Sequence, residues 1–308
     1  MSLPDHAPPP LDPIAARRWQ NLMGAPLTSP TSPWLHEEVG RRMAERLNWI
    51  KQRPDAWLDW APARGGLAAH RLVAGAYPAA RQWVHEPSPR ALAQSQRALV
   101  PPWWHAQRWW GGQTGPEFGL PPAHAMGMVW SNMGLHSTAQ PVQWMSDWHQ
   151  SLRNDGFLMF SCLGPDTLKE LRALYEQLGW PAPAQAFTDM HDWGDLLVEA
   201  GFSEPVMDME RIVLTYATPE RLLEELRELG RNLHPQRFGA CRGRGWWGSL
   251  KRALETMSPM QLTFEVIYGH AIKPPTRLKV APEAVISLDD MKASLRRQGP
   301  TKSEQDRG

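Results

Sequence analysis

The chain has 308 residues and a formal net charge of +1 at pH 7. Its length is enough for one large domain or two small ones with a sizeable core, and its nearly balanced charge gives no overall attraction to nucleic acid or to an anionic membrane. The first residues, MSLPDHAPPPLDP, carry proline and acid where a signal peptide needs an apolar core, and no apolar run approaches the ~18 residues of a spanning helix. We therefore expect a soluble, cytoplasmic protein without a membrane partner.

The first predicted elements alternate between helix and strand. A helix is expected to begin at Pro33, after a serine cap, and to continue as WLHEEVGRRMAERLNWI. Short apolar runs predict one strand at 56–58, which ends on Asp59, and a second at 82–85, which ends on Glu86. Each of the first two strands is thus followed directly by an acid.

The middle of the chain is less regular. PRALAQSQRAL, residues 89–99, predicts a helix capped by the preceding serine. Residues 101–123 are rich in Trp, Gly and Pro and have weak periodicity, so we expect a loop with one short strand. A buried strand is predicted at 126–130, and a helix, PVQWMSDWHQSLR, begins at Pro141.

The second half continues the alternation. Asn154, Asp155 and Gly156 predict a turn before the strand FLMFS. Three helices and two more strands are expected after it, in the order PDTLKELRALYEQL, HDWGDLLVEAGF, ERIVLTY, TPERLLEELRELG and LTFEVIYGHAI. Thr218 is expected to cap the last of these helices.

Short apolar strands that alternate with amphipathic helices imply an α/β fold, with a mostly parallel sheet covered on both faces. We expect one domain over residues 14–274, between a disordered tail at 1–13 and a disordered polar tail at 275–308. In such a sheet the ligand lies beyond the carboxyl ends of the strands. The residues that follow the predicted strands are therefore the candidates for a binding site.

Asp59 and Glu86 are the first of these candidates. An acid after the second strand can accept both hydroxyls of a ribose, although two acids in exposed turns would give the same pattern. The loop between them begins WAPARGG, residues 60–66. A nucleoside-binding turn needs glycines there, because its backbone adopts unusual angles and approaches the ligand closely. Here glycine comes only at the end, and Pro62 has no N–H to donate.

Polar residues also follow the later strands. Ser131 and Asn132 lie where a polar contact to a ligand is expected, and His136 is placed to reach a substrate. Ser161 and Cys162 follow FLMF at the same predicted edge. The alternative for Asn132 and His136 is that they bond only to backbone groups of their own loop.

Cations are concentrated in residues 227–252. We take Arg237, Arg242 and Arg244 as a docking patch for an acidic partner, either an acyl carrier protein or RNA. A solvated, partly helical face would give the same composition. The aromatic residues at 103–105 and 109–110 allow two interpretations, a stacking platform or core packing.

Several kinds of site are missing from the sequence. There is no GxSxG, HExxH, GxxxxGKS/T or CxxC motif, so hydrolase, metalloprotease and P-loop chemistry are not expected. The two cysteines, Cys162 and Cys241, have no metal-ligand spacing and are expected to be buried, reduced thiols. We therefore predict no metal site.

The segments VWSNMGLH, FLMFSCLGPDTLKELR, MHDWGDLLVEAGFSEPVMDMERIVLTY and LTFEVIYGHAIKP resemble the malonyl-acyl-carrier-protein O-methyltransferase family of biotin synthesis. More distantly, they resemble the methyltransferase-like assembly factors of respiratory complex I. The match runs from about Arg17 to Pro274 and is most specific from Gly164 to Tyr216. The resemblance implies a seven-stranded class I methyltransferase (Rossmann-like) fold, S-adenosylmethionine as the cofactor, and a malonyl group on acyl carrier protein as the acceptor.

Carried over by position, WLDWAPARGG stands where the family has its acid-plus-glycine cofactor motif. Asp59 and Gly65 match the motif, whereas Ala61, Pro62 and Ala63 depart from it. A tyrosine that the family carries ahead of its first long helix is missing from MGAPLTSPTSPW. The cofactor contacts that the resemblance implies are Asp59, Gly65, Glu86, Ser131 and Asn132.

The resemblance implies a reaction that needs few side chains. A malonyl carboxylate is already ionised at neutral pH, so no general base and no catalytic residue is assigned. The rate would come from aligning the carboxylate with the methyl group in a pocket that excludes water. Two alternatives stay open: a catalytically inert relative that uses the fold for assembly or regulation, and an RNA-binding or RNA-methylating protein, although nucleic acid is not the expected partner.

Overall fold

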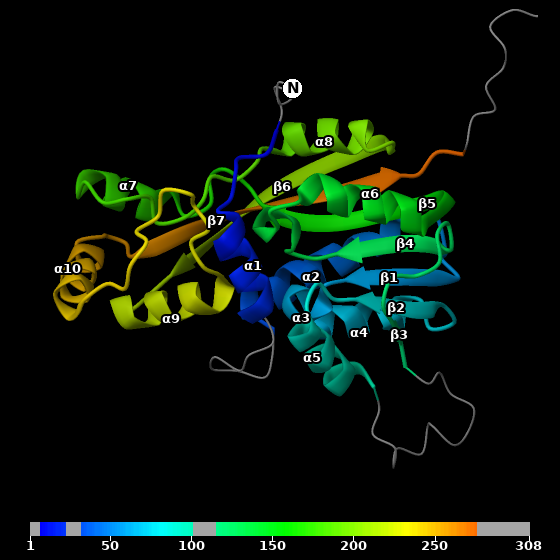
Figure 1. The fold of residues 1–308 in the computed structure, drawn as a ribbon, viewed down its shortest axis with the longest axis horizontal. Coiled ribbons are helices and arrows are strands. Elements are labelled where there is room, and N and C mark those ends of the chain that lie inside the picture. The colour runs from blue at the N-terminus through cyan, green and yellow to red at the C-terminus, as the bar shows by residue number, and fades with distance from the viewer. Residues whose placement is uncertain (1–6, 23–31, 101–114, 276–308) are drawn as a thin grey trace, which may run out of the picture. The chain divides into compact units, whose positions relative to one another are not determined.

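A single seven-stranded sheet runs through the protein (Figure 1). The computed structural model describes residues 7–22, 32–100 and 115–275. The strand order is β3-β2-β1-β4-β5-β7-β6, in which β1 to β5 pair in parallel and β7 pairs antiparallel with both β5 and β6. The strands are β1 (Ala56–Trp60), β2 (Arg81–His85), β3 (Glu117–Phe118), β4 (Met126–Ser131), β5 (Leu152–Leu163), β6 (Ser203–Thr215) and β7 (Gln261–Ile272).

Helices cover both faces of this sheet, as the sequence pattern predicts (Figure 1). This is the seven-stranded α/β arrangement that the sequence resemblance implies. Two of the expected caps are present: Ser88 accepts the N–H of Ala91, and Thr218 accepts the N–H of Arg221. The serine cap expected before Pro33 is wrong, because Pro33 is itself the N-cap of the helix and the hydroxyl of Ser32 accepts the N–H of Leu67 instead. The helices are α1 (Pro13–Leu22), α2 (Trp34–Arg46), α3 (Pro62–Gly65), α4 (Leu67–Ala76), α5 (Pro89–Leu99), α6 (Pro141–Ser151), α7 (Lys169–Gln177), α8 (Met190–Glu199), α9 (Pro219–Leu229) and α10 (Arg244–Glu255), with short 3-10 turns at Leu47–Trp49 and Leu135–Ser137.

The core consists of two apolar layers, one on each face of the sheet. Side chains alternate along each strand, so Trp57 faces the layer that contains α2, whereas Leu58 faces the layer that contains α6 and α8. Every residue of β1 and β4 is buried. These central strands read as continuous apolar runs because helices cover them on both sides.

The structure corrects two expectations near β5. The predicted turn at 154–156 lies within the strand, where Asp155 takes a left-handed φ of 60° and the register with β4 shifts between Met126 and Met128. Such an irregularity absorbs turn-forming residues without ending the strand. Ser161 and Cys162 also lie inside β5, which continues to Leu163, so they do not lie beyond its end.

Only part of each predicted tail lies within the described residues. Asp12 precedes α1, and its carboxylate accepts the N–H groups of Ile14 and Ala15. The polar tail predicted from 275 onward lies outside the described residues except for Pro275, so the domain limits 14–274 stay a prediction. No helix in the described ranges is long and apolar enough to cross a membrane.

Candidate functional site

The carboxyl ends of β2, β1 and β4 bring three of the predicted residues to one edge of the sheet. Asp59 pairs in register with Val84 of β2 and with Trp130 of β4. Glu86 therefore follows on one side of Asp59, and Ser131 closes β4 on the other.

Asp59 is an interior anchor rather than part of an exposed turn. Its carboxylate Oδ2 lies 2.8 Å from Nδ1 of His70 on α4, and the residue is 2% exposed. Burial raises the pKa of Asp59, and the hydrogen bond from His70 opposes that rise. The second ring nitrogen of His70 lies 3.3 Å from the side-chain oxygen of Gln82 on β2. The predicted cofactor acid thus ties α4 to the sheet.

The loop after β1 closes into one buried helical turn, α3. Ala61 takes the left-handed conformation, with φ 64° and ψ 47°, that a glycine would adopt more easily. Its N–H donates to His85 at 2.8 Å, and its carbonyl accepts the N–H of Gly65 at 2.9 Å. The backbone geometry of a glycine turn is therefore retained with alanine, but the whole turn is buried against protein.

Glu86 points into this turn. Its Oε1 accepts the backbone N–H of Ala63 at 2.7 Å and the hydroxyl of Ser95 at 2.6 Å. Desolvation by burial raises the pKa of Glu86 to about 8, and the nearby charge of Asp59 adds to the rise. Oε2 accepts no hydrogen bond from the described residues, so one oxygen is left for a ligand hydroxyl.

Asn132 locks the other side of α3. Its amide nitrogen donates to the carbonyl of His36 at 2.7 Å and also to that of Gly65, and its side-chain oxygen accepts the hydroxyl of Ser161 at 2.6 Å. A Cβ on Gly65 would lie 2.6 Å from the backbone oxygen of Asn132, so only glycine fits there. Ser131 is fully buried, and its hydroxyl has no partner in the described part of the chain.

The residues at this edge fit the ribose of a nucleoside cofactor and not its amino-acid end. Glu86 stands at the expected position with one oxygen free. The loop, in contrast, offers few donors: Pro62 has no N–H, the N–H of Ala63 is taken by Glu86, and that of Gly65 by Ala61. A cofactor that used the N–H of Ala63 would have to displace its bond to Glu86.

His136 lies on the 3-10 turn after β4, is half-buried and lines two cavities. Its Nδ1 accepts the N–H of Leu163 at 3.3 Å, so the proton of the neutral ring is on Nε2. Burial, with a smaller contribution from the charge of Arg64, lowers the pKa of His136 to about 3. His136 is thus a neutral N–H donor at physiological pH.

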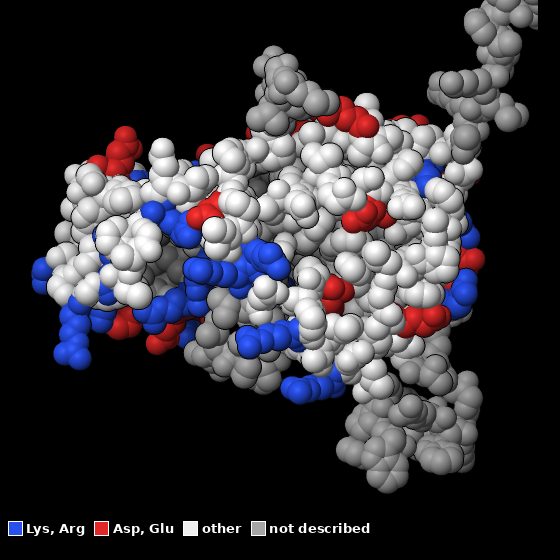
Figure 2. Space-filling model, in the orientation of Figure 1, with Lys and Arg blue, Asp and Glu red and all other residues white. Residues whose placement is uncertain are grey.

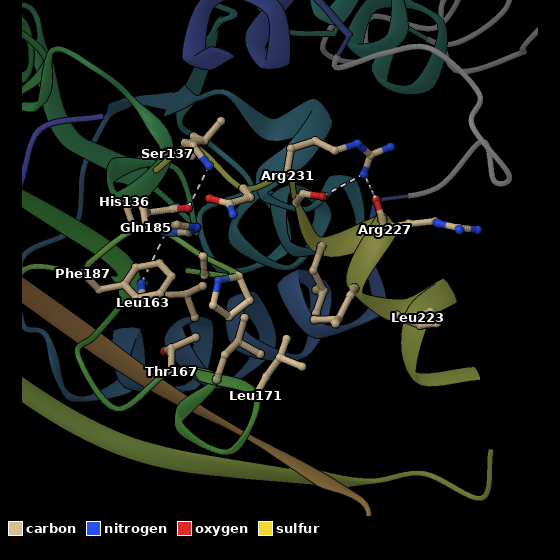
Figure 3. Close-up of a pocket in the computed structure, with 18 of the residues that line it drawn as sticks. His136, Ser137, Leu163, Thr167, Leu171, Gln185, Phe187, Leu223, Arg227 and Arg231 are labelled. Carbon is tan, nitrogen blue, oxygen red and sulfur yellow. Dashed lines mark hydrogen bonds between the residues drawn. The ribbon is translucent and has the colours of Figure 1, made fainter. Parts of the chain in front are cut away.

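One of these cavities, of about 230 Å³, opens between β5, α7, α9 and α10 (Figure 3). Apolar side chains form most of its walls, and four basic side chains complete them. No Asp or Glu lies among its described lining residues. The basic residues are Arg64, His136, Arg227 and Arg231.

Arg64 is the residue that sequence reasoning missed. Its side chain is 8% exposed, its guanidinium lies over the ring of Trp19 at 4.2 Å, and one nitrogen donates to the carbonyl of Leu229. Its Nε is buried without a hydrogen-bond partner. Burial, with the charge of Arg231, lowers the pKa of Arg64 to about 9. The available signal was a cation inside WAPARGG, a loop otherwise made of small residues and Trp60.

The predicted docking patch is divided by the structure. Arg237 forms an ion pair with Asp12, so its charge is partly neutralised. Arg242 lies over the rings of Phe238 at 3.5 Å and Trp246 at 4.6 Å, and Arg244 begins α10. Figure 2 shows Lys and Arg gathered on the face where Figure 1 places α1, α9 and α10.

The two cysteines and the aromatic residues near position 105 were the remaining features singled out in the sequence. Cys162 is buried as expected, whereas Cys241 is exposed, in the irregular segment before α10, and both thiols are free. The prediction of two buried thiols is therefore wrong for Cys241. The aromatic residues at 103–105 and 109–110 lie outside the described residues.

Known proteins resemble this chain closely in sequence. It is 37% identical over 269 residues to the malonyl-acyl-carrier-protein O-methyltransferase of Gallionella capsiferriformans, covering 82% of this chain and 88% of that protein. It is 35% identical over 260 residues to the protein of the same name from Laribacter hongkongensis, covering 79% and 84%. No family model matches the chain.

A solved structure agrees in fold. A Bacillus halodurans C-125 protein assigned as a methyltransferase superposes with a TM-score of 0.50 at 12% identity, covering 76% of this chain and all of that one. At this identity the likeness shows the fold alone. It agrees with the seven-stranded topology described above.

Proposed function

Because the chain belongs to the malonyl-acyl-carrier-protein O-methyltransferase family, we propose that it transfers a methyl group from S-adenosylmethionine to the free carboxylate of a malonyl group carried on acyl carrier protein. The observation that carries this proposal is the cavity beside α3. It has basic groups and no acidic ones among its described lining residues, as a site for a carboxylate requires.

The proposed reaction needs few side chains of the protein. A malonyl carboxylate is ionised at neutral pH, so the acceptor needs no base. The neutral N–H of His136 and the cation of Arg64 would orient the carboxylate, and the apolar walls would exclude water. When bound, S-adenosylmethionine would supply an electrophilic methyl group, and Glu86 would hold its ribose through Oε2.

The partner follows from the surface around the cavity. Acyl carrier proteins are acidic, and Arg227 and Arg231 line the cavity while Arg242 and Arg244 lie on the segment that leads into α10. A cationic surface of this kind steers an acidic protein toward the opening and makes the association sensitive to salt. We therefore assign the carrier protein to this face.

The test is methyl transfer to a malonyl-loaded carrier protein, followed by mass spectrometry of the intact acyl carrier. We expect one methyl ester per malonyl group and none on an acetyl-loaded carrier, which has no free carboxylate. If neither carrier is methylated and S-adenosylhomocysteine leaves the melting temperature unchanged at millimolar concentration, the proposal is overturned. That result would favour the inert relative.

A further inference from the structure

The cavity contains a buried cation without a counterion. Arg64 is almost fully buried, yet its one hydrogen bond from the guanidinium goes to a neutral acceptor, the carbonyl of Leu229. Its Nε has no partner. Charged groups removed from water are normally paired, because an uncompensated charge destabilises the fold. Arg231, which lines the same cavity and acts on the pKa of Arg64, carries a charge of the same sign.

Other basic groups surround Arg64 without supplying an acid. His36 is buried beneath the turn, and its Nδ1 lies 2.9 Å from the carbonyl oxygen of Arg64. Burial lowers the pKa of His36 and also that of His136, and the charge of Arg64 contributes to both shifts. His36 contacts the backbone of Arg64, and Arg64 and His136 line the same cavity. Both histidines are neutral at physiological pH, so Arg64 carries the charge of this cluster, and that charge has no counterion among the described residues. An anionic ligand would complete the cluster.

The chemistry of the remaining cavity walls indicates what the rest of the ligand is. Most of them are apolar side chains, and a single methylene would leave most of this apolar surface uncovered. Figure 3 shows leucine and phenylalanine side chains directed toward the same space as His136. They are Leu163, Leu168, Leu171, Phe187, Leu223 and Phe264.

We propose that Arg64 is the anchor of a carboxylate-binding subsite, and that the cavity takes a carboxylate joined to an apolar chain of several carbons. This deepens the proposed function, on which it rests only for calling that ligand an acyl acceptor. It extends the acceptor class beyond malonyl, toward longer ω-carboxyacyl groups.

A carboxylate could also come from the amino-acid end of the cofactor, and the walls argue against that source. That end carries an ammonium beside its carboxylate, and the cofactor adds a sulfonium. Neither cation would find an acid here, since the described lining contains none, while Arg227 and Arg231 would repel both. An acyl chain needs no such partner.

The test compares octanoate with octanamide, a neutral molecule of the same length, by calorimetry on the full chain without cofactor. We expect octanoate to bind the unmodified protein about 10- to 100-fold more tightly than octanamide, the range for a charged hydrogen-bonded contact. Arg64→Met should remove this preference. Arg172→Met should keep it, because Arg172 also donates to a backbone carbonyl, that of Pro165, but does not line the cavity.

Equal binding of octanoate and octanamide by the unmodified protein would overturn the subsite, and this comparison needs no variant to fold. A preference that persists in Arg64→Met would overturn the assignment of Arg64. If Arg64→Met weakens the binding of S-adenosylhomocysteine and leaves the binding of octanoate unchanged, the carboxylate that Arg64 holds is that of the cofactor, and the acyl proposal fails. Octanoate binding without methyl transfer would support the subsite while contradicting the proposed function.

Discussion

The carboxyl group of Glu86 holds the backbone N–H of Ala63 at 2.7 Å, and so takes a donor that a nucleoside-binding loop would present to its ligand. The same group is raised in pKa to about 8 by burial. Closure of the loop and protonation of Glu86 are therefore linked, because both depend on how far this side chain is removed from water.

Glu86→Gln should change how stability depends on pH. The folded pKa of about 8 lies above the ordinary value of 4.5, so the folded protein binds the proton more tightly than the unfolded chain. The unmodified protein should therefore lose stability as pH rises from about 4.5 to 8, by roughly 1–3 kcal/mol, because the residue is only half-buried and solvent screens part of the effect. Urea unfolding at several pH values should show a flatter profile for Glu86→Gln.

Glu38 supplies the control of opposite sign. Hydrogen bonds and charge from Arg41 and Arg42 lower the pKa of Glu38 to about 2. Its contribution to stability is present above the ordinary value of 4.5 and is lost as pH falls toward 2. The free energy of unfolding of Glu38→Gln should therefore be lower than that of the unmodified protein at neutral pH, and the two values should converge in acid. Parallel profiles for the two variants would contradict the link between Glu86 and the closed loop.

Ala61→Gly should stabilise the protein. Ala61 has φ 64°, which glycine adopts without strain. The free energy of unfolding of the glycine variant should therefore exceed that of the unmodified protein by about 0.5–1 kcal/mol. Ala63→Gly, two residues on in the helical turn, should lower stability by about 1 kcal/mol, because glycine is a poor helix former. Denaturant titration of both variants measures the contrast. A loss of stability in Ala61→Gly would show that the left-handed residue is not strained.

Gly65→Ala should disrupt the turn. The new methyl would lie 2.6 Å from the backbone oxygen of Asn132, so we expect a loss of roughly 1–3 kcal/mol. The matched control is Gly75→Ala on α4, where a Cβ meets nothing within 4 Å and stability should rise by about 0.5 kcal/mol. Similar melting temperatures for both variants would rule out close packing between α3 and Asn132.

The docking patch should separate into two parts on charge reversal. Arg242→Glu together with Arg244→Glu should weaken binding of the carrier protein, most strongly at low salt. The free energy of unfolding should stay nearly unchanged. Arg237→Glu should instead lower stability, because it places a second acid beside Asp12. Calorimetry at two salt concentrations, with a short RNA in parallel, measures the effect. Binding of RNA alone would overturn the carrier-protein assignment.

Sequence patterns predicted the sheet and most of its helices because the signals are local. Serine and threonine caps with proline after them mark the start of α5 and α9, and continuous apolar runs mark β1 and β4. Helices α1, α3, α4 and α10 were not predicted as elements, and the residues of α3 were expected to form a loop. Their pattern is weaker, and tertiary packing supplies much of the stability of such helices.

The site was harder to predict because its contacts cross the chain. Asp59, Glu86 and Asn132 were placed at the correct edge, but the sequence does not tell that Asp59 pairs with His70 or that Asn132 reaches back to Gly65. Arg64 escaped notice for the same reason. Its role in the proposal depends on residues that lie far apart in sequence and line one cavity, none of which is acidic among those that the structure describes.

The position of β7 has a consequence for synthesis of the chain. Among the described strands, β6 pairs with β7 alone, and β7 is the last of them to be made. While the ribosome adds residues 216–272, the backbone groups of both β5 and β6 on that side have no strand to pair with. A nascent chain therefore carries two open sheet edges until Ile272 has emerged, and at that stage it is most exposed to pairing with another chain.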